Sequence, residues 1–148
     1  MTEKFVSTEE NSKVFFDSNI FVYSIDEHDV QKKEIAKQLL TQHKESTVIS
    51  TQNLQEFYNA STKKLGIEKS KMKQAVEQLS NAFPVQQITP AIILKAIDIQ
   101  IKNALSFYDS LIISTASKNG CVVCYSEDFN AGQIIDGVKV INPFMRAR

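Results

Sequence analysis

The sequence predicts an α/β fold built on a mostly parallel central sheet. Short apolar runs of strand-forming residues alternate along the chain with longer segments of helical periodicity, an order that is typical of parallel sheets. The chain has 148 residues, of which 43% are hydrophobic and 23% charged, so it fits a single domain with one core. No internal repeat or low-complexity linker divides it.

Five short runs are expected to form strands because they are apolar and rich in β-branched or aromatic residues. They are residues 14–16, 47–50, 85–88, 121–125 and 138–141. The first run ends abruptly at Asp17, and the last is closed by Asn142-Pro143. Pro84 separates the third run from the helix that precedes it.

The helices expected in the first half begin at polar residues. Residues 20–25 favour a short helix, although their β-branched and aromatic side chains leave a strand as the alternative. Asp29 can cap a helix that runs to about His43. Its apolar stripe is expected to consist of Val30, Ile35, Ala36, Leu39 and Leu40. A third helix covers residues 51–64.

Three further helices are expected in the second half. Residues 68–82 are amphipathic through Met72, Val76 and Leu79. Thr89-Pro90 is a strong start signal for a helix over residues 91–103, with Thr as the cap and Pro in the first turn. A helix over residues 107–119 begins after Ser106, is apolar on most sides and stops at Gly120, which indicates a central packed helix.

Residues 13–144 are expected to form the folded domain, between a polar N-terminal leader at residues 1–12 and a C-terminal tail at residues 145–148. The leader has no basic segment followed by an apolar core, so it does not resemble a secretory signal. Apolar stretches such as residues 91–94 fall far below the ~20 residues that span a bilayer. We therefore expect a cytoplasmic protein without a membrane partner.

Two cysteines, Cys121 and Cys124, have a spacing that invites a redox or zinc interpretation. No second Cys or His pair completes a tetrahedral site, and in a regular strand an offset of three residues sends the side chains to opposite faces. We expect both cysteines to be buried and reduced.

Several function classes are disfavoured. Seventeen Lys and Arg residues balance seventeen Asp and Glu residues, so nucleic-acid binding would have to come from local charge patterning. The chain contains no Gly-x-Gly-x-x-Gly, P-loop or Gly-x-Ser-x-Gly motif. Carboxylates at strand ends and helix starts remain as the candidates for chemistry.

Four acids occupy such positions: Asp17 after the first strand, Glu56 early in the helix after the second, Asp109 at the start of the apolar helix, and Asp128 after residues 121–125. In a parallel α/β sheet, groups at the carboxyl ends of strands converge on one site. Each acid also has an ordinary structural explanation, as a turn residue, a solvent-facing residue, a helix-dipole charge or a cap. Together they would repel one another unless protons or cations compensate, and Mg²⁺ or Mn²⁺ would suit carboxylate oxygens and phosphoryl substrates.

Four ordered segments of the chain resemble PIN domains, and most closely the VapC-type toxins of bacterial and archaeal toxin–antitoxin systems. The segments are Val14-Phe-Phe-Asp-Ser-Asn-Ile, Asn53-Leu-Gln-Glu-Phe, Leu105-Ser-Phe-Tyr-Asp-Ser-Leu-Ile and Tyr125-Ser-Glu-Asp-Phe-Asn-Ala-Gly, followed by Val140-Ile-Asn-Pro-Phe. The resemblance covers about residues 13–144. It implies a three-layer α/β/α fold and Mg²⁺- or Mn²⁺-dependent ribonuclease activity.

Carried over by position, the resemblance implies catalytic and metal-binding roles for the four acids. Asp17 and Asp109 would hold the principal ion, Asp128 would complete its shell, and Glu56 would orient or deprotonate the attacking water. Asn19 and Ser126 would support the pocket, although both have local turn-forming roles as alternatives. Ser110 departs from the small apolar residue frequent in the family, without consequence for metal binding.

The implied partners are RNA, a cognate antitoxin that could offer a basic side chain to the carboxylates, and a second copy of the chain. Five lysines between Lys63 and Lys73 could contact the RNA backbone, although such a cluster is usually a solvated face. A set of apolar residues beside the acids would form either a dimer surface or the core beneath the pocket: Phe21, Tyr23, Ile25, Phe57 and Tyr58.

Two other functions compete with a toxin ribonuclease. A non-catalytic PIN-like module would bind RNA or protein without cleavage, and the complete acid set argues against it. A phosphoacceptor signalling domain would need an acidic doublet after the first strand and an acceptor Asp after the third, and Phe16-Asp17 and Ile88-Thr89-Pro90 supply neither.

Overall fold

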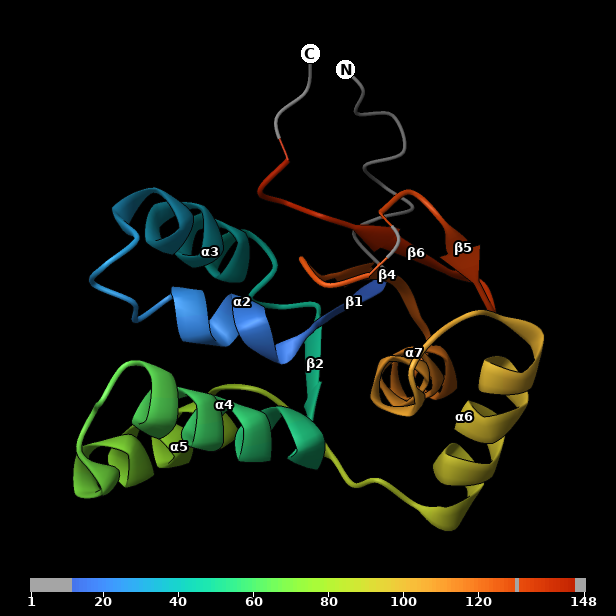
Figure 1. Ribbon diagram of the computed structural model, residues 1–148, viewed down its shortest axis with the longest axis horizontal. Helices are drawn as coiled ribbons and strands as arrows, with labels where there is room; N and C mark the ends of the chain where they lie inside the picture. The colour runs from blue at the N-terminus through green and yellow to red at the C-terminus, as the bar shows by residue number, and fades with distance from the viewer. Residues whose placement is uncertain (1–11, 130, 146–148) are drawn as a thin grey trace.

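The computed structural model describes residues 12–129 and 131–145, and these form a three-layer α/β/α fold (Figure 1). The expected fold class is confirmed. Nearly all of the predicted leader at residues 1–12, and all but the first residue of the predicted tail at residues 145–148, lie outside the described residues.

A six-stranded sheet forms the middle layer, in the order β3-β2-β1-β4-β6-β5. The strands are β1 (Lys13–Phe16), β2 (Thr47–Ser50), β3 (Val85–Gln86), β4 (Cys121–Tyr125), β5 (Ile134–Ile135) and β6 (Val138–Ile141). All neighbouring pairs are parallel except β5 and β6. The chain runs outward from β1 to β3 and then returns to β4 on the other side of β1, so the strand order reverses between β1 and β4.

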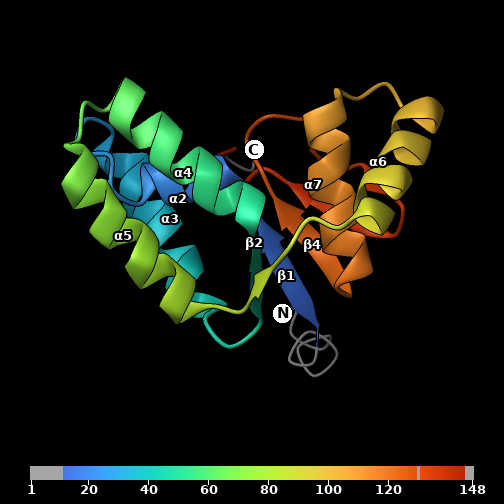
Figure 2. The same cartoon turned by 90° about the horizontal axis from the view of Figure 1, so that it is seen from below.

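Helices cover both faces of the sheet (Figure 2). One layer contains α2 (Ser18–Tyr23), α3 (Val30–Gln42), α4 (Thr51–Lys64) and α5 (Lys69–Ala82), and the other contains α6 (Pro90–Lys102) and α7 (Phe107–Lys118). The expected caps are present, since side-chain oxygens of Asp29, Thr89 and Ser106 each accept a backbone N–H of the first helical turn. None of the described helices combines the length and apolar character needed to cross a bilayer.

The alternation of β1 divides the core between the two faces. Val14 and Phe16 belong to the cluster under the α2–α5 layer. Phe15 belongs to the cluster on the other face, with residues of α6, α7 and β6. This is the period of two expected for a central strand that is buried on both sides. The first strand is thereby fixed in register, and Asp17 is held at its carboxyl end.

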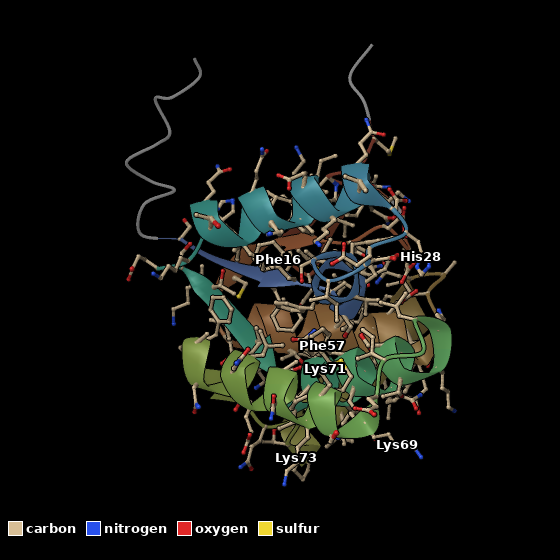
Figure 3. The ribbon with its side chains drawn as sticks, turned by 90° about the vertical axis from the view of Figure 1, so that its left-hand side faces the viewer. Phe16, His28, Phe57, Lys69, Lys71 and Lys73 are labelled. Carbon is tan, nitrogen blue, oxygen red and sulfur yellow. The ribbon has the colours of Figure 1, made fainter. Side chains whose placement is uncertain are left out.

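The apolar residues proposed for a dimer surface belong instead to the core. Phe21 and Phe57 are buried, and Tyr23, Ile25 and Tyr58 pack partly buried against the same cluster. Figure 3 shows Phe16 and Phe57 in the interior between α3 and α5. The core alternative is confirmed, since the Phe21 ring packs edge-on against the Phe16 ring of β1 and the Phe57 ring of α4.

Several details of the helices and strands differ from expectation, since β3 ends at Gln86 rather than at Ile88 and α2 covers Ser18–Tyr23 rather than residues 20–25. Val30 was expected in the apolar stripe of α3, but its side chain is 65% exposed because it stands in the first turn, beyond the edge of the core. The hairpin strand β5 was not expected, and it pairs antiparallel with β6 through a two-residue turn at Asp136-Gly137. Both turn residues have positive φ, 50° and 81°, as such a turn requires.

Cys121 and Cys124 are free and buried, as expected, but they do not face opposite sides of the sheet. Both belong to the cluster under α6 and α7. The pairing of β1 with β4 skips Val122, so β4 carries an irregularity that shifts the alternation by one residue. Burial raises the pKa of the Cys121 thiol to about 12 and also raises that of Cys124, so both thiols stay protonated.

Candidate active site

The candidate site lies where the strand order reverses. Asp17 directly follows β1 and Ser126 directly follows β4, and these two strands are neighbours in the sheet. Ligands of open α/β sheets bind in the crevice outside the carboxyl ends of the strands at such a reversal. The topology therefore brings together residues that are more than half of the chain apart in sequence.

Asp17 is the most buried acid of the site, with 5% of its surface exposed. Its Oδ1 accepts the Ser18 backbone N–H at 2.7 Å, which caps α2, and its Oδ2 accepts the Ser126 hydroxyl at 2.7 Å. Burial, together with the nearby negative charges of Asp128 and Glu56, raises the pKa of Asp17 to about 7, although both hydrogen bonds act in the opposite direction.

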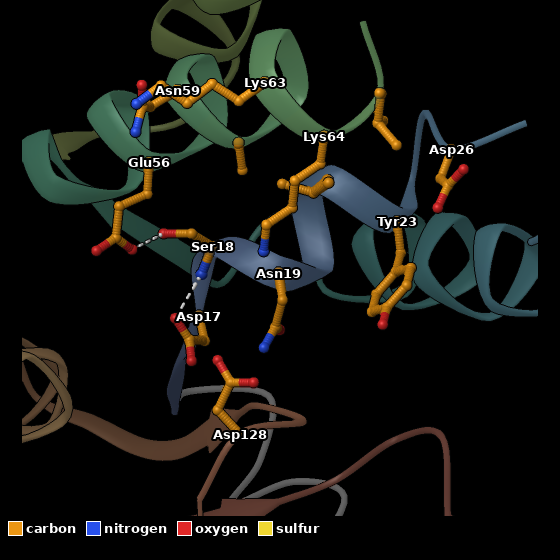
Figure 4. A pocket seen from close by; sticks show the side chains of 13 residues that line it. Asp17, Ser18, Asn19, Tyr23, Asp26, Glu56, Asn59, Lys63, Lys64 and Asp128 are labelled. Carbon is orange, nitrogen blue, oxygen red and sulfur yellow. Dashed lines mark hydrogen bonds between the residues drawn. The ribbon is translucent and has the colours of Figure 1, made fainter. Parts of the chain in front are cut away.

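Glu56 reaches the site from the second turn of α4. Its Oε1 accepts the Ser18 hydroxyl at 2.7 Å and its Oε2 accepts the Gln52 side-chain amide at 3.1 Å. Ser18 thus links the two acids, since its backbone N–H binds Asp17 and its hydroxyl binds Glu56 (Figure 4). The hydrogen bonds fix the orientation of the Glu56 carboxylate relative to Asp17.

A buried amide that sequence reasoning did not assign to the site supports this arrangement. Asn53 donates to the Phe16 carbonyl at 3.0 Å and to the Ser18 hydroxyl at 3.2 Å, and its Oδ1 accepts the Ser50 N–H at 2.9 Å. It joins the end of β1, the start of α2 and the cap of α4. The signal was the Ser50–Asn53 spacing, which is that of a capping box.

The remaining two acids come from later in the chain, Asp128 after β4 and Asp109 in α7. Asp128 donates its backbone N–H to the Ser126 hydroxyl at 3.0 Å, and Figure 4 shows its carboxylate facing Asp17. Asp109, in the first turn of α7, is half-buried, and its pKa is raised by burial and by the charges of Asp128 and Glu56.

A cavity of about 540 Å³ opens over these residues. Its lining includes Asp17, Asn19, Glu56 and Asp128, but not Asp109, and Ser126 lies beneath it through its hydrogen bond to Asp17. Three of the four predicted acids therefore share one cavity wall. That they are catalytic, and that Asp109 completes the set, stays a prediction.

The donor set fits a hard divalent cation. Carboxylate, hydroxyl and amide oxygens surround the cavity, and these are the ligands that Mg²⁺ and Mn²⁺ prefer. The side-chain amide of Asn19 is buried, and neither its oxygen nor its nitrogen has a partner within the described residues. In residues 12–129 and 131–145, no three acidic, His or Cys side chains stand close enough together to form a ready metal cluster.

The sequence matches the family model of the PIN domain over residues 14–134. The chain belongs to the PIN domain family. A search of curated proteins by sequence found no match.

The fold of this PIN domain is similar to those of several solved structures. A toxin–antitoxin complex from Klebsiella pneumoniae matches with a TM-score of 0.67 at 20% identity, covering 89% of this chain and 98% of that one. A DNA-bound VapBC from Salmonella typhimurium matches with a TM-score of 0.67 at 19% identity, covering 87% and 96%. The sarcin–ricin-loop-cleaving toxin VapC20 of Mycobacterium tuberculosis matches with a TM-score of 0.64 at 16% identity, covering 78% and 90%.

Proposed function

We propose that this PIN domain is a Mg²⁺- or Mn²⁺-dependent ribonuclease. The observation that carries the proposal is the meeting of Asp17, Glu56 and Asp128 on one cavity at the strand-order reversal. Mutually repelling carboxylates with a raised Asp17 pKa destabilise a metal-free site, and a cation relieves that repulsion. We assign this activity to the domain formed by residues 13–144.

The acids would divide the work. Asp17, Asp109 and Asp128 would hold the cation, which supplies Lewis-acid stabilisation of the charge that develops on the scissile phosphate. Glu56, oriented by Ser18 and Gln52, would accept a proton from the water that attacks phosphorus as the P–O bond breaks. Ser126 would hold Asp17, and Asn19 would bind cation-associated water.

We further propose that the enzyme is the toxin of a toxin–antitoxin pair and acts in the cytoplasm as a homodimer. Structures of toxin–antitoxin complexes are among its fold neighbours, which supports this assignment at the level of fold. The acidic cavity would accept a basic side chain of an antitoxin, which would replace the cation. Induced expression should arrest bacterial growth, and Asp17→Asn should not.

The deciding experiment is cleavage of a labelled single-stranded RNA by purified protein with Mn²⁺, Mg²⁺ or EDTA. We expect cleavage with either metal and none with EDTA or in Asp17→Asn. Binding of the same RNA without cleavage in any metal would overturn the proposed activity and favour the non-catalytic PIN-like module.

A further inference from the structure

Five lysines between Lys63 and Lys73 form one cluster in the sequence, but the structure divides them. Lys63 and Lys64, in the last turn of α4, line the cavity that holds the acids. Lys69, Lys71 and Lys73 lie on α5 and do not line it (Figure 3). Two lysines of the cluster are therefore available to a ligand in the site, and three are not.

Neither of the two cavity lysines forms an ion pair within the described part of the chain. Ion pairs among the described residues use Lys32, Lys33 and Lys95, and none involves Lys63 or Lys64. Figure 4 shows the Lys64 side chain extending from α4 into the cavity toward Asn19. An unpaired ammonium that reaches into an otherwise acidic cavity is suited to an anion that arrives with the substrate.

The spacing along α4 relates these lysines to the proposed chemistry. Glu56 and Lys64 line the same cavity, two helical turns apart, which is about 12 Å along the axis at ~1.5 Å per residue. Ala60 lies between them on the cavity wall, and its small side chain leaves the path open. A strand with its scissile phosphate at the acids would bring a neighbouring phosphate to the end of α4.

The acids alone would repel the nucleic-acid backbone. Four carboxylates line the cavity, from Asp17, Asp26, Glu56 and Asp128. The chain as a whole has no net charge to attract a polyanion, so affinity must come from local cations.

We propose that Lys63 and Lys64 form a phosphate-binding subsite that holds the RNA backbone one or two nucleotides from the scissile bond. The inference rests on the proposed ribonuclease function and adds to it the residues that contact substrate. A lysine contacts the phosphate as a point charge, so this subsite would fix the position of the strand without reading its sequence.

The test is binding of a fluorescein-labelled single-stranded RNA by fluorescence anisotropy, in Ca²⁺ at several salt concentrations. The variants are Lys63→Ala/Lys64→Ala, the charge-preserving Lys63→Arg/Lys64→Arg, and the matched control Lys69→Ala/Lys71→Ala. We expect the cavity double variant to bind about tenfold more weakly, with a salt slope reduced by about 1.4 because two phosphate contacts are lost. The control should change affinity less than twofold, and the arginine variant should retain affinity.

Because these lysines also face the negative end of the α4 dipole, thermal unfolding of each variant is measured in parallel. Equal loss of affinity in the cavity and control variants, an unchanged salt slope, or absence of RNA binding by the unmodified protein would each overturn the subsite. Cleavage is scored separately with Mn²⁺. RNA that is bound through these lysines but not cut would overturn the proposed activity and leave the subsite standing.

Discussion

At the scale of single residues, the chemistry of the site is concentrated in Asp17. Its carboxylate is buried at the end of β1, receives two hydrogen bonds, and faces other negative charges. Hydrogen bonds stabilise its charged form while burial and repulsion disfavour that form, and the second effect is larger. Asp17 is thus held in position by hydrogen bonds, and its ionisation at neutral pH costs folding free energy.

The first prediction is that Asp17→Asn stabilises the metal-free protein at pH 8. Because the folded-state pKa of about 7 lies above the ordinary 3.8, the stability from Asp17 is fully present below 3.8 and is lost as pH rises through 7. At ~1.4 kcal/mol per pKa unit, the loss is on the order of a few kcal/mol. Asn removes this loss and keeps an acceptor for Ser18.

Urea unfolding at pH 5 and pH 8 in EDTA measures the effect. The unmodified protein should lose stability between these pH values more steeply than the variant, and added Mn²⁺ should stabilise it at pH 8 by more than it stabilises the variant. Earlier unfolding of Asp17→Asn at pH 8 in EDTA would contradict the repulsion argument.

The second prediction concerns the thiols of Cys121 and Cys124. Both are buried under α6 and α7 and burial raises both pKa values, so neither offers a thiolate at pH 8. An aromatic disulfide reagent should therefore react with neither cysteine in the native protein and with both after denaturation in urea. Rapid labelling of either thiol without urea would show that the core between the sheet and α6 and α7 opens readily.

At the scale of elements, Lys32 on α3 fastens the segment after β4. Its ammonium pairs with Glu127, lies 3.3 Å from the Tyr23 hydroxyl, and stands over the Tyr23 and Phe144 rings at 4.8 and 5.4 Å. The Tyr23 hydroxyl also donates to Glu127 at 2.6 Å. Glu127 lies between Ser126 and Asp128, so these contacts hold the segment that carries two site residues.

We therefore predict that Lys32→Met loosens the Asp128 segment and weakens Mn²⁺ binding. Lys33→Met is the matched control. Lys33 lies on the same helix as Lys32 but pairs at 2.8 Å with the exposed Glu27, which precedes the helix and is not part of the Asp128 segment. Hydrogen exchange over residues 126–129 should be faster in Lys32→Met alone, and calorimetric titration should show weaker Mn²⁺ affinity. Indistinguishable exchange in the two variants would contradict the role of the contact.

Sequence patterns predicted the elements well where a local signal exists. The caps at Asp29, Thr89 and Ser106 mark helix starts because a single side chain satisfies a free backbone N–H. The hairpin at Asp136-Gly137 also carried a local signal, which was missed because its strands are short. The irregularity in β4 carried none, since a bulge depends on how the neighbouring strand pairs.

The sequence pointed to the acids of the candidate site but not to the side chains that hold or surround them. A strand-end acid such as Asp17 is recognisable from the sequence, and the α/β pattern implies that such acids converge. The capping-box spacing indicates Asn53 as part of a helix cap, but the hydrogen bonds of Asn53 and Glu56 with Ser18 depend on α2 and α4 meeting over the end of β1. The same applies to Lys64, whose entry into the cavity depends on where α4 ends.

At the scale of the whole molecule, α6 leaves an apolar face uncovered. Ile92, Ala96 and Ile99 pack inward, whereas the opposite side exposes Ile93, Leu94, Ile97 and Ile101 by 37%, 64%, 40% and 78%. Ile134 on β5 is also exposed, and Lys95 ties α6 to the β5–β6 turn through Asp136 at 3.2 Å. A stripe of this kind marks an interface, and the expected homodimer has no comparable surface around Phe21 and Phe57.

The last prediction is that two copies pair through α6 about a two-fold axis, which brings the same stripe of each copy against the other. Light scattering at tens of micromolar should give about twice 16.7 kDa for the unmodified protein. Leu94→Glu/Ile101→Glu should give the monomer mass while keeping the fold, because both side chains are exposed in the single chain. Val30→Glu, at an exposed apolar position on α3, is the control and should stay dimeric. A monomer mass for the unmodified protein would remove the dimer, and a dimer that persists in the double variant would move the interface away from α6.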